Sequence, residues 1–128
     1  MRKAITSDNV PKAKFRYSPC VNIGNIYSIS GMIGIDKETG LLVQTGVADE
    51  TYMIFKNLLN ALPDYGLSLN ELLVVRIFTT KFESFGDINS VWEKFFPITE
   101  TPPARTSVGV SALPLGATVE VEFTFVKS

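Results

Sequence analysis

The chain has 128 residues, 45% of them hydrophobic, and a formal net charge of −1; we expect one domain over residues 1–128, because this length supports a single core. It contains no histidine and one cysteine, Cys20, which excludes serine–histidine triads, imidazole metal ligands and disulfide frameworks within one chain. The near-zero charge gives no electrostatic reason to expect a nucleic acid as a partner.

The N-terminal residues 1–8 lack the apolar stretch of a secretory signal, and no apolar run approaches the ~20 residues of a membrane span. We therefore expect a cytoplasmic protein with no membrane partner. Residues 2–6 are expected to form a first strand before a polar, basic loop. Tyr17 follows this loop and is either an amphipathic packing residue or part of a ligand pocket. Cys20 is expected to be buried as a small apolar residue.

A hairpin is expected next, because residues 21–23 and 26–29 are strand-like and flank the Gly24-Asn25 pair. Ser30-Gly31 should end its second arm. The glycine either forms a bulge that turns the strand or lets a ligand approach the backbone closely. Residues 36–40 read as a polar turn.

Helical spacing of apolar residues predicts a first helix over residues 47–62, ended by Pro63 and Gly66. Ser68 and Glu71 have the spacing of a capping box for one short turn. Residues 72–79 are apolar and β-branched, which predicts a strand in the centre of a sheet.

A second helix is expected over residues 84–96, with a core-facing stripe made of Ile88, Val91, Trp92, Phe95 and Phe96. Asn89 lies outside this stripe. Pro97 should end the helix.

The C-terminal part should contain two further strands. Pro102-Pro103 precede a β-branched run that carries Arg105, and the segment 113–116 makes a bend. From Val119 to Phe125 apolar and polar residues alternate, which places the valines and phenylalanines on the core and Glu120, Glu122 and Thr124 on the opposite face.

Two adjacent strands in this region would bring Arg105 and Glu120 into the same cleft. Arg105 offers a planar donor fork suited to a carboxylate, and Glu120 can accept a proton from water. From the pattern alone, both can equally be surface residues that pair with other charges and keep an exposed face soluble.

Taken together, these segments resemble the RidA/YjgF family of enamine/imine deaminases, in the family's order and over nearly the whole chain. The residues that carry the resemblance are Tyr17, Ser30-Gly31, Thr39-Gly40, Gly66-Leu67, Asn89, Trp92 to Phe96, Pro103 to Thr106, Val108, Val110, Leu113-Pro114 and Val119 to Glu122.

The element order predicts an α+β domain: a mainly antiparallel six-stranded sheet with two helices on one face. The resemblance implies the same fold, a chorismate-mutase-like sheet whose homotrimer closes three sheets into a central barrel. It also implies active sites between subunits, with Arg105, Ser107 and Glu120 on one subunit. The high apolar content suggests that other subunits cover part of the surface.

The activity implied by the resemblance is hydrolysis of 2-aminoacrylate-type enamines and imines to 2-oxo acids and ammonia, without a metal or organic cofactor. Arg105 would bind the substrate carboxylate and Glu120 would activate water. The implied substrate-binding residues are Tyr17, Ser30, Gly31, Asn89 and Ser107.

Several positions depart from the family's common pattern, among them Ser107, where cysteine is frequent, and Gly109, where glutamate is frequent. Met32, Phe15-Arg16 and the bulky Phe123 and Phe125 are others. A larger imino acid or a 2-aminomuconate-like substrate therefore fits the sequence as well. The alternative function is a non-catalytic trimer that binds 2-oxo acids and reports their level. An endoribonuclease, also associated with the family, is disfavoured by the near-neutral charge and the lack of histidine.

Overall fold

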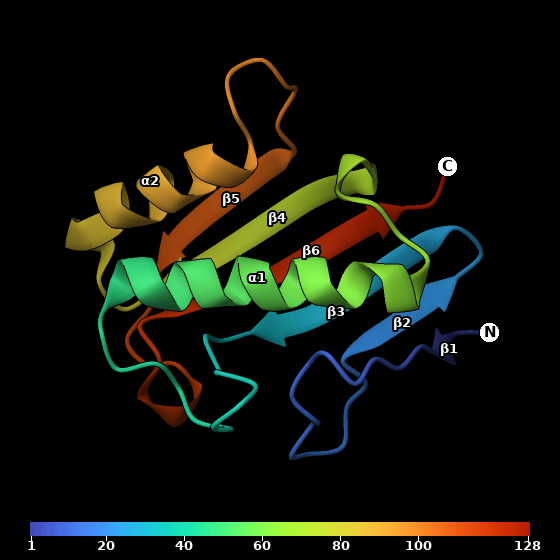
Figure 1. Ribbon diagram of the computed structural model, residues 1–128, viewed down its shortest axis with the longest axis horizontal. Helices are drawn as coiled ribbons and strands as arrows, with labels where there is room; N and C mark the ends of the chain where they lie inside the picture. Colours follow the sequence, from blue (N-terminus) through green and yellow to red (C-terminus); the bar gives the residue numbers. More distant parts are fainter.

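A six-stranded sheet forms one layer of the molecule, and two helices cover one of its faces (Figure 1). The computed structural model describes all 128 residues. The expected α+β architecture is confirmed. The strands are β1 (Lys3–Ala4), β2 (Cys20–Ile23), β3 (Ile26–Met32), β4 (Leu72–Thr79), β5 (Ala104–Gly109) and β6 (Val119–Val126), and the helices are α1 (Val47–Tyr65) and α2 (Phe85–Phe95).

The strands lie in the order β1-β2-β3-β6-β4-β5. Only the β4–β5 pair is parallel, and the other pairs are antiparallel. Strand β4 is paired on both sides, as its apolar sequence predicted, whereas β5 is an edge strand. The first strand is shorter than expected, because only Lys3 and Ala4 pair with β2.

The expected hairpin is present as β2 and β3, joined through Gly24 at a φ of +57°. Its second arm does not end at Ser30-Gly31 but continues to Met32. The pairing with β6 shifts register between Ile29 and Met32. Gly31 therefore lies in an irregularity that re-aims the strand, which is the bulge considered for the sequence.

Helix α1 continues through Pro63 to Tyr65, one turn beyond the expected end. The proline removes one hydrogen bond from the last turn, but Tyr65 and Leu67 are buried beyond it. Gly66 ends the helix at a φ of +71°. The Leu67 N–H donates to the Leu62 carbonyl and the Gly66 N–H donates to the Pro63 carbonyl, which together form a Schellman motif.

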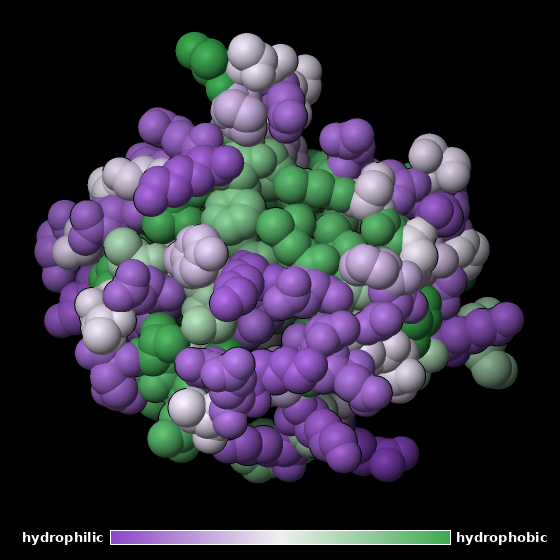
Figure 2. Space-filling model, viewed as in Figure 1, coloured by the Kyte–Doolittle hydropathy of each residue, from purple (hydrophilic) through white to green (hydrophobic).

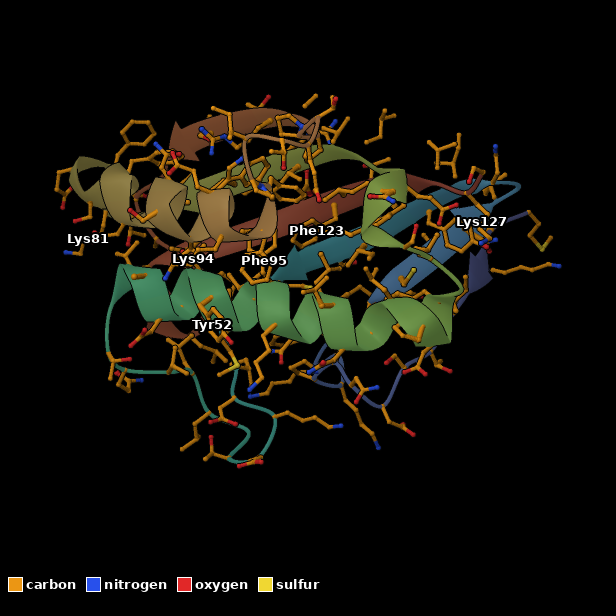
Figure 3. The ribbon with its side chains drawn as sticks, turned by 45° about the horizontal axis from the view of Figure 1, so that its top comes forward. Tyr52, Lys81, Lys94, Phe95, Phe123 and Lys127 are labelled. Carbon is orange, nitrogen blue, oxygen red and sulfur yellow. The ribbon has the colours of Figure 1, made fainter.

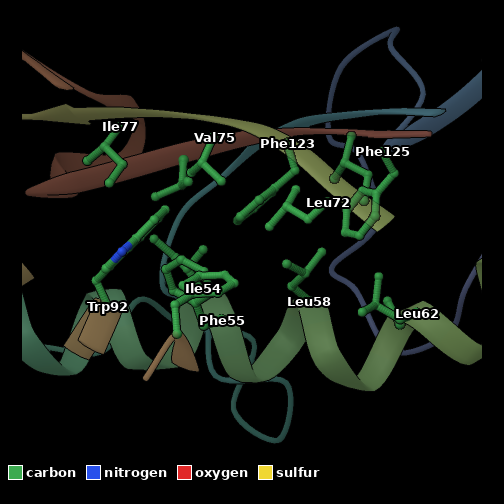
Figure 4. Close-up of a cluster of buried hydrophobic side chains, with 14 of the residues drawn as sticks. Ile54, Phe55, Leu58, Leu62, Leu72, Val75, Ile77, Trp92, Phe123 and Phe125 are labelled. Carbon is green, nitrogen blue, oxygen red and sulfur yellow. The ribbon is translucent and has the colours of Figure 1, made fainter. Parts of the chain in front are cut away.

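The core lies between the helices and the sheet (Figure 4). The Phe55 ring is at its centre, stacked on Phe95 at 5.0 Å and edge-on to Phe123 at 5.6 Å. On the outer side, Tyr52 and Phe95 lie where α1 meets α2, with ring centroids 6.1 Å apart (Figure 3). Cys20 is fully buried as expected, and burial raises the pKa of its thiol to about 11, so it is an inert packing residue.

The helix-covered face is largely hydrophilic at its surface, with a hydrophobic area above the middle of α1 and beside the C-terminal end of α2 (Figure 2). The other face of the sheet carries no helix. It exposes the apolar residues Ile23, Ile26 and Val108 and also carries a 3.8 Å ion pair between Arg76 and Glu122. We call this surface the open face. Neither helix is long and apolar enough to cross a lipid bilayer.

Candidate functional site

Arg105 lies on the edge strand β5 and points toward helix α2. Its Nη1 donates a hydrogen bond to Asn89 Oδ1 at 2.9 Å. Its Cζ lies 4.7 Å from the Trp92 ring centroid and 5.3 Å from that of Phe85. Two aromatic faces and one amide thus fix the orientation of the guanidinium, while its other donors stay available to a ligand. We call this group of four residues the Arg105 clamp.

The clamp follows from local geometry. Phe85, Asn89 and Trp92 are spaced four and three residues apart, so they share one side of α2. The parallel pairing sets Arg105 beside Val75 and Ser107 beside Ile77, whose side chains are buried beneath the helices. Arg105 and Ser107 therefore both face the helix side of the sheet. The structure brings together three of the predicted site residues here: Arg105, Asn89 and Ser107.

Glu120 lies on β6 and points to the open face, because its neighbours Val119 and Val121 are fully buried beneath the helices. Burial, and secondarily the like charge of Glu122, raises the pKa of the Glu120 carboxyl. A carboxylate with a raised pKa is a better proton acceptor near neutral pH.

Gly31 lies directly against Glu120. A Cβ atom at Gly31 would be only 2.7 Å from Glu120 Oε2 and 2.8 Å from Glu120 Cδ. The glycine is therefore required for the carboxylate to lie where it does. The adjacent Ser30 donates from Oγ to the Ser18 carbonyl at 2.7 Å. That bond ties the strand to the loop carrying Tyr17, which is 52% exposed. We call Glu120, Gly31 and Ser30 the Glu120 cluster.

Arg105 and Glu120 do not meet within one chain. We expected them on adjacent strands, and this expectation is wrong, since β4 lies between β5 and β6. Arg105 faces the helix side of the sheet and Glu120 faces the open side. The register also offsets them, because Arg105 is level with Val75 whereas Glu120 is level with Phe78.

Two features of the site were not predicted from the sequence. Trp92 was assigned to the core stripe alone, yet its ring also supports Arg105. The second feature is Glu50, a buried carboxylate on α1 that accepts hydrogen bonds from the Thr118 N–H, at 2.8 Å, and from the Thr118 hydroxyl. Glu50 thus holds the backbone two residues before Glu120. The spacing of Phe85, Asn89 and Trp92 could have revealed the first feature, but no local signal marks the second.

A hollow of about 330 Å³ on the helix side is lined by Leu69, Asn70, Leu72, Phe96, Glu100, Thr101 and Pro103. It contains neither Arg105 nor Glu120, and its lining has no cationic side chain to hold a carboxylate. The structure contains no group of three or more histidine, cysteine, aspartate or glutamate side chains that could hold a metal ion. The Arg105 clamp and the Glu120 cluster are thus the candidate site groups that we consider further.

Comparison with known proteins gives consistent matches along the chain. The family model described as endoribonuclease L-PSP matches residues 7–127. A RutC family protein of Aquifex aeolicus is 37% identical over 125 residues, which cover 98% of this chain and 99% of that protein. The 2-iminobutanoate/2-iminopropanoate deaminase of Mus musculus is 33% identical over 122 residues, covering 95% and 89%. The crystal structure of RidA from a Psychrobacter species superposes with a TM-score of 0.88 at 33% identity, covering 97% and 98%.

Proposed function

We propose that this chain, which belongs to the endoribonuclease L-PSP (RidA/YjgF) family, hydrolyses reactive 2-imino acids and their enamine tautomers to 2-oxo acids and ammonia. The name of the mouse relative supports this class of reaction. The family's other name points to ribonuclease chemistry. A formal net charge of −1 and the lack of histidine argue against RNA cleavage.

The observation that carries the proposal is the Arg105 clamp. Its guanidinium is bonded to the neutral Asn89 rather than to a carboxylate, so its positive charge is not neutralised. A planar, pre-oriented guanidinium with free donors binds a carboxylate through two parallel hydrogen bonds. Every 2-imino acid carries such a carboxylate next to its C=N carbon. Fixing that group orients the electrophilic carbon, which by itself accelerates attack by water.

Glu120 supplies the base in this proposal. Its carboxylate accepts a proton from water as the water oxygen forms a bond to the imine carbon, and it passes this proton to the imine nitrogen as the C=N π bond breaks. In the resulting carbinolamine, Glu120 takes the hydroxyl proton and delivers it to the nitrogen. The C=O bond then forms as the C–N bond breaks, so that ammonia leaves and the 2-oxo acid remains. General base catalysis of this kind contributes about 10²–10⁴-fold, which suits substrates that also hydrolyse unaided.

We infer that the complete site lies between two copies of the chain. Arg105 with Asn89 and Ser107 would come from one subunit, and Glu120 with Gly31, Ser30 and Tyr17 from its neighbour. The opposite faces of Arg105 and Glu120 support this arrangement, as do the apolar residues on the open face, which a homotrimer would cover. This division differs from the one implied by the resemblance, in which Arg105, Ser107 and Glu120 share a subunit.

A second function, the binding of 2-oxo acids without turnover, is favoured by one observation. The Arg105 clamp consists of a guanidinium, an amide and two aromatic rings and holds no general base. A single chain thus has the means to capture a carboxylate but not to transfer a proton next to it. If Glu120 of a second subunit does not reach the clamp, the protein is a metabolite-binding module.

The test generates 2-imino acids in situ with an amino-acid oxidase and follows their disappearance by competition with semicarbazide. We expect the wild type to accelerate hydrolysis, and Arg105→Ala and Glu120→Ala each to lose at least about 100-fold in kcat/KM. Tight binding of 2-oxo acids with no acceleration by the wild type would instead establish the binding module. Unchanged activity in both variants would refute the proposed roles.

A further inference from the structure

An exposed aromatic residue, Phe82, lies next to the Arg105 clamp. Its ring contacts Phe85, which in turn contacts the guanidinium of Arg105. Phe82 is 49% exposed, and its ring stacks on that of Phe85 with centroids 5.1 Å apart and an angle of 28°. The Phe85 ring in turn lies 5.3 Å from Arg105 Cζ. The stacking holds Phe82 in place while much of its surface remains open to solvent, so it is a preformed apolar contact surface.

Strand β5 presents no side chain opposite this ring. Gly109 is on the same face of β5 as Arg105 and Ser107. A Cβ atom at Gly109 would lie 3.5 Å from Phe82 Cβ and 3.6 Å from Phe82 Cδ2. The bare backbone at Gly109 therefore lies beside Phe82, and the strip from Ser107 to Gly109 is left uncovered by any bulky strand residue.

The residues that the contacts place along this strip are Phe82, Phe85, Ser107 and Gly109, and none of them carries a charge. A strand rises about 3.3 Å per residue, so Gly109 lies about 13 Å along β5 from Arg105. A ligand anchored at Arg105 thus has uncharged residues, two of them aromatic, along a strip long enough for a branched or aromatic side chain.

We propose that Phe82 and Gly109 form the subsite for the substrate side chain and select 2-imino and 2-oxo acids with bulky apolar side chains over those with a methyl group. This inference rests on the proposed role of Arg105 as the carboxylate anchor. With the carboxylate at Arg105 and the reacting carbon over Ser107, a leucine-derived side chain contacts the Phe82 ring and releases water from it. The methyl group of an alanine-derived substrate does not reach the ring.

Trp92 provides a direct binding signal, because it is the only tryptophan in the chain and lies 4.7 Å from Arg105 Cζ. Titrations followed by its fluorescence, and repeated by calorimetry, compare pyruvate with 4-methyl-2-oxopentanoate. The wild type should bind the larger acid about tenfold more tightly, and Phe82→Ala should reduce this preference to less than about twofold. The kcat/KM ratio for leucine- and alanine-derived imines should shift in the same direction.

Two further variants complete the experiment. Gly109→Glu places a charge in the strip without a backbone clash, since its Cβ makes only ordinary contacts, and it should also abolish the preference. Tyr52→Ala is the matched control, because Tyr52 is similarly exposed, at 47%, but lies on α1 against Phe95. It should keep the wild-type preference.

The outcomes separate this inference from the proposed function. The inference is wrong if the wild type prefers the larger compound neither in 2-oxo acid affinity nor in kcat/KM for imines. It is also wrong if the Phe82→Ala variant keeps the full preference, even if imines are hydrolysed. A preference in 2-oxo acid binding that depends on Phe82 supports the inference even if no imine is hydrolysed, and in that case the deaminase proposal fails alone. Absence of both binding and turnover refutes the two together.

Discussion

The opposite faces of Arg105 and Glu120 lead to a quantitative prediction about mixed subunits. If each site takes Arg105 from one subunit and Glu120 from a neighbour, two inactive variants should restore activity when mixed. Arg105→Ala chains retain Glu120, and Glu120→Ala chains retain Arg105. In randomly assembled trimers from an equal mixture, about one quarter of the sites contain both native residues. Activity should therefore recover to about one quarter of the wild-type value.

The assay dissociates the two purified variants, reassembles them together and measures imine hydrolysis, with native mass spectrometry of a mass-tagged variant to verify mixed trimers. An equal mixture of wild type with the Arg105→Ala/Glu120→Ala double variant is the control. It should retain about one quarter of the wild-type activity if the residues act across subunits and about one half if they act within one subunit. The shared site would be refuted if the mixed trimers of the two single variants showed no activity and the control mixture retained one half of the wild-type activity.

Three further predictions follow from individual contacts. Arg105→Lys should lose about 10- to 100-fold in kcat/KM. An ammonium cannot make the second of the two charge-assisted hydrogen bonds to the carboxylate, and that bond is worth about 1.5–3 kcal/mol. A wild-type rate in this variant would contradict the bidentate role of Arg105. Gly31→Ala should displace the Glu120 carboxylate, because the new Cβ would lie 2.7 Å from its Oε2 atom, and this should lower kcat at least about tenfold. The control is Gly86→Ala, which should leave kcat unchanged because nothing lies within 4 Å of the new Cβ. Hydrogen bonds from Ser128 and Ser68 lower the pKa of Glu71 to about 2 from its ordinary 4.5. Its stabilising effect should therefore be complete above pH 4.5 and lost as pH falls toward 2, so thermal unfolding of Glu71→Gln and wild type should differ at pH 7 and converge near pH 2.

Much of the fold was predictable because its signals are local. The alternation from Val119 to Phe125 gives β6 with its buried face, and the stripe from Ile88 to Phe96 gives α2. The expected end of α1 at Pro63 was wrong for a tertiary reason. One missing hydrogen bond in the last turn is offset by the burial of Tyr65 in the hydrophobic core.

The relative placement of the site residues was not predictable in the same way. Chain order puts β5 directly before β6, yet β4 inserts between them, and strand order depends on packing over the whole sheet rather than on any local pattern. The face of Arg105 depends on its register beside Val75. A shift by one residue would move its side chain to the open face, and the Pro102-Pro103 and Ala104 residues before it do not specify that register.

The separation of Arg105 from Glu120 within one chain has a chemical consequence. If the two side chains met in the isolated subunit they would form an ion pair, which would lower the pKa of Glu120 and occupy the donors needed by the substrate. Instead Arg105 is bonded to the neutral Asn89, and Glu120 lies against Gly31 with Glu122 as a like-charged neighbour. Glu122 itself lies 3.8 Å from Arg76, so that nearby cation is paired with Glu122. In the proposed site, Arg105 would therefore stay free to bind the substrate carboxylate, and Glu120 would keep its raised pKa until a neighbouring subunit brings it to the imine carbon of the same substrate.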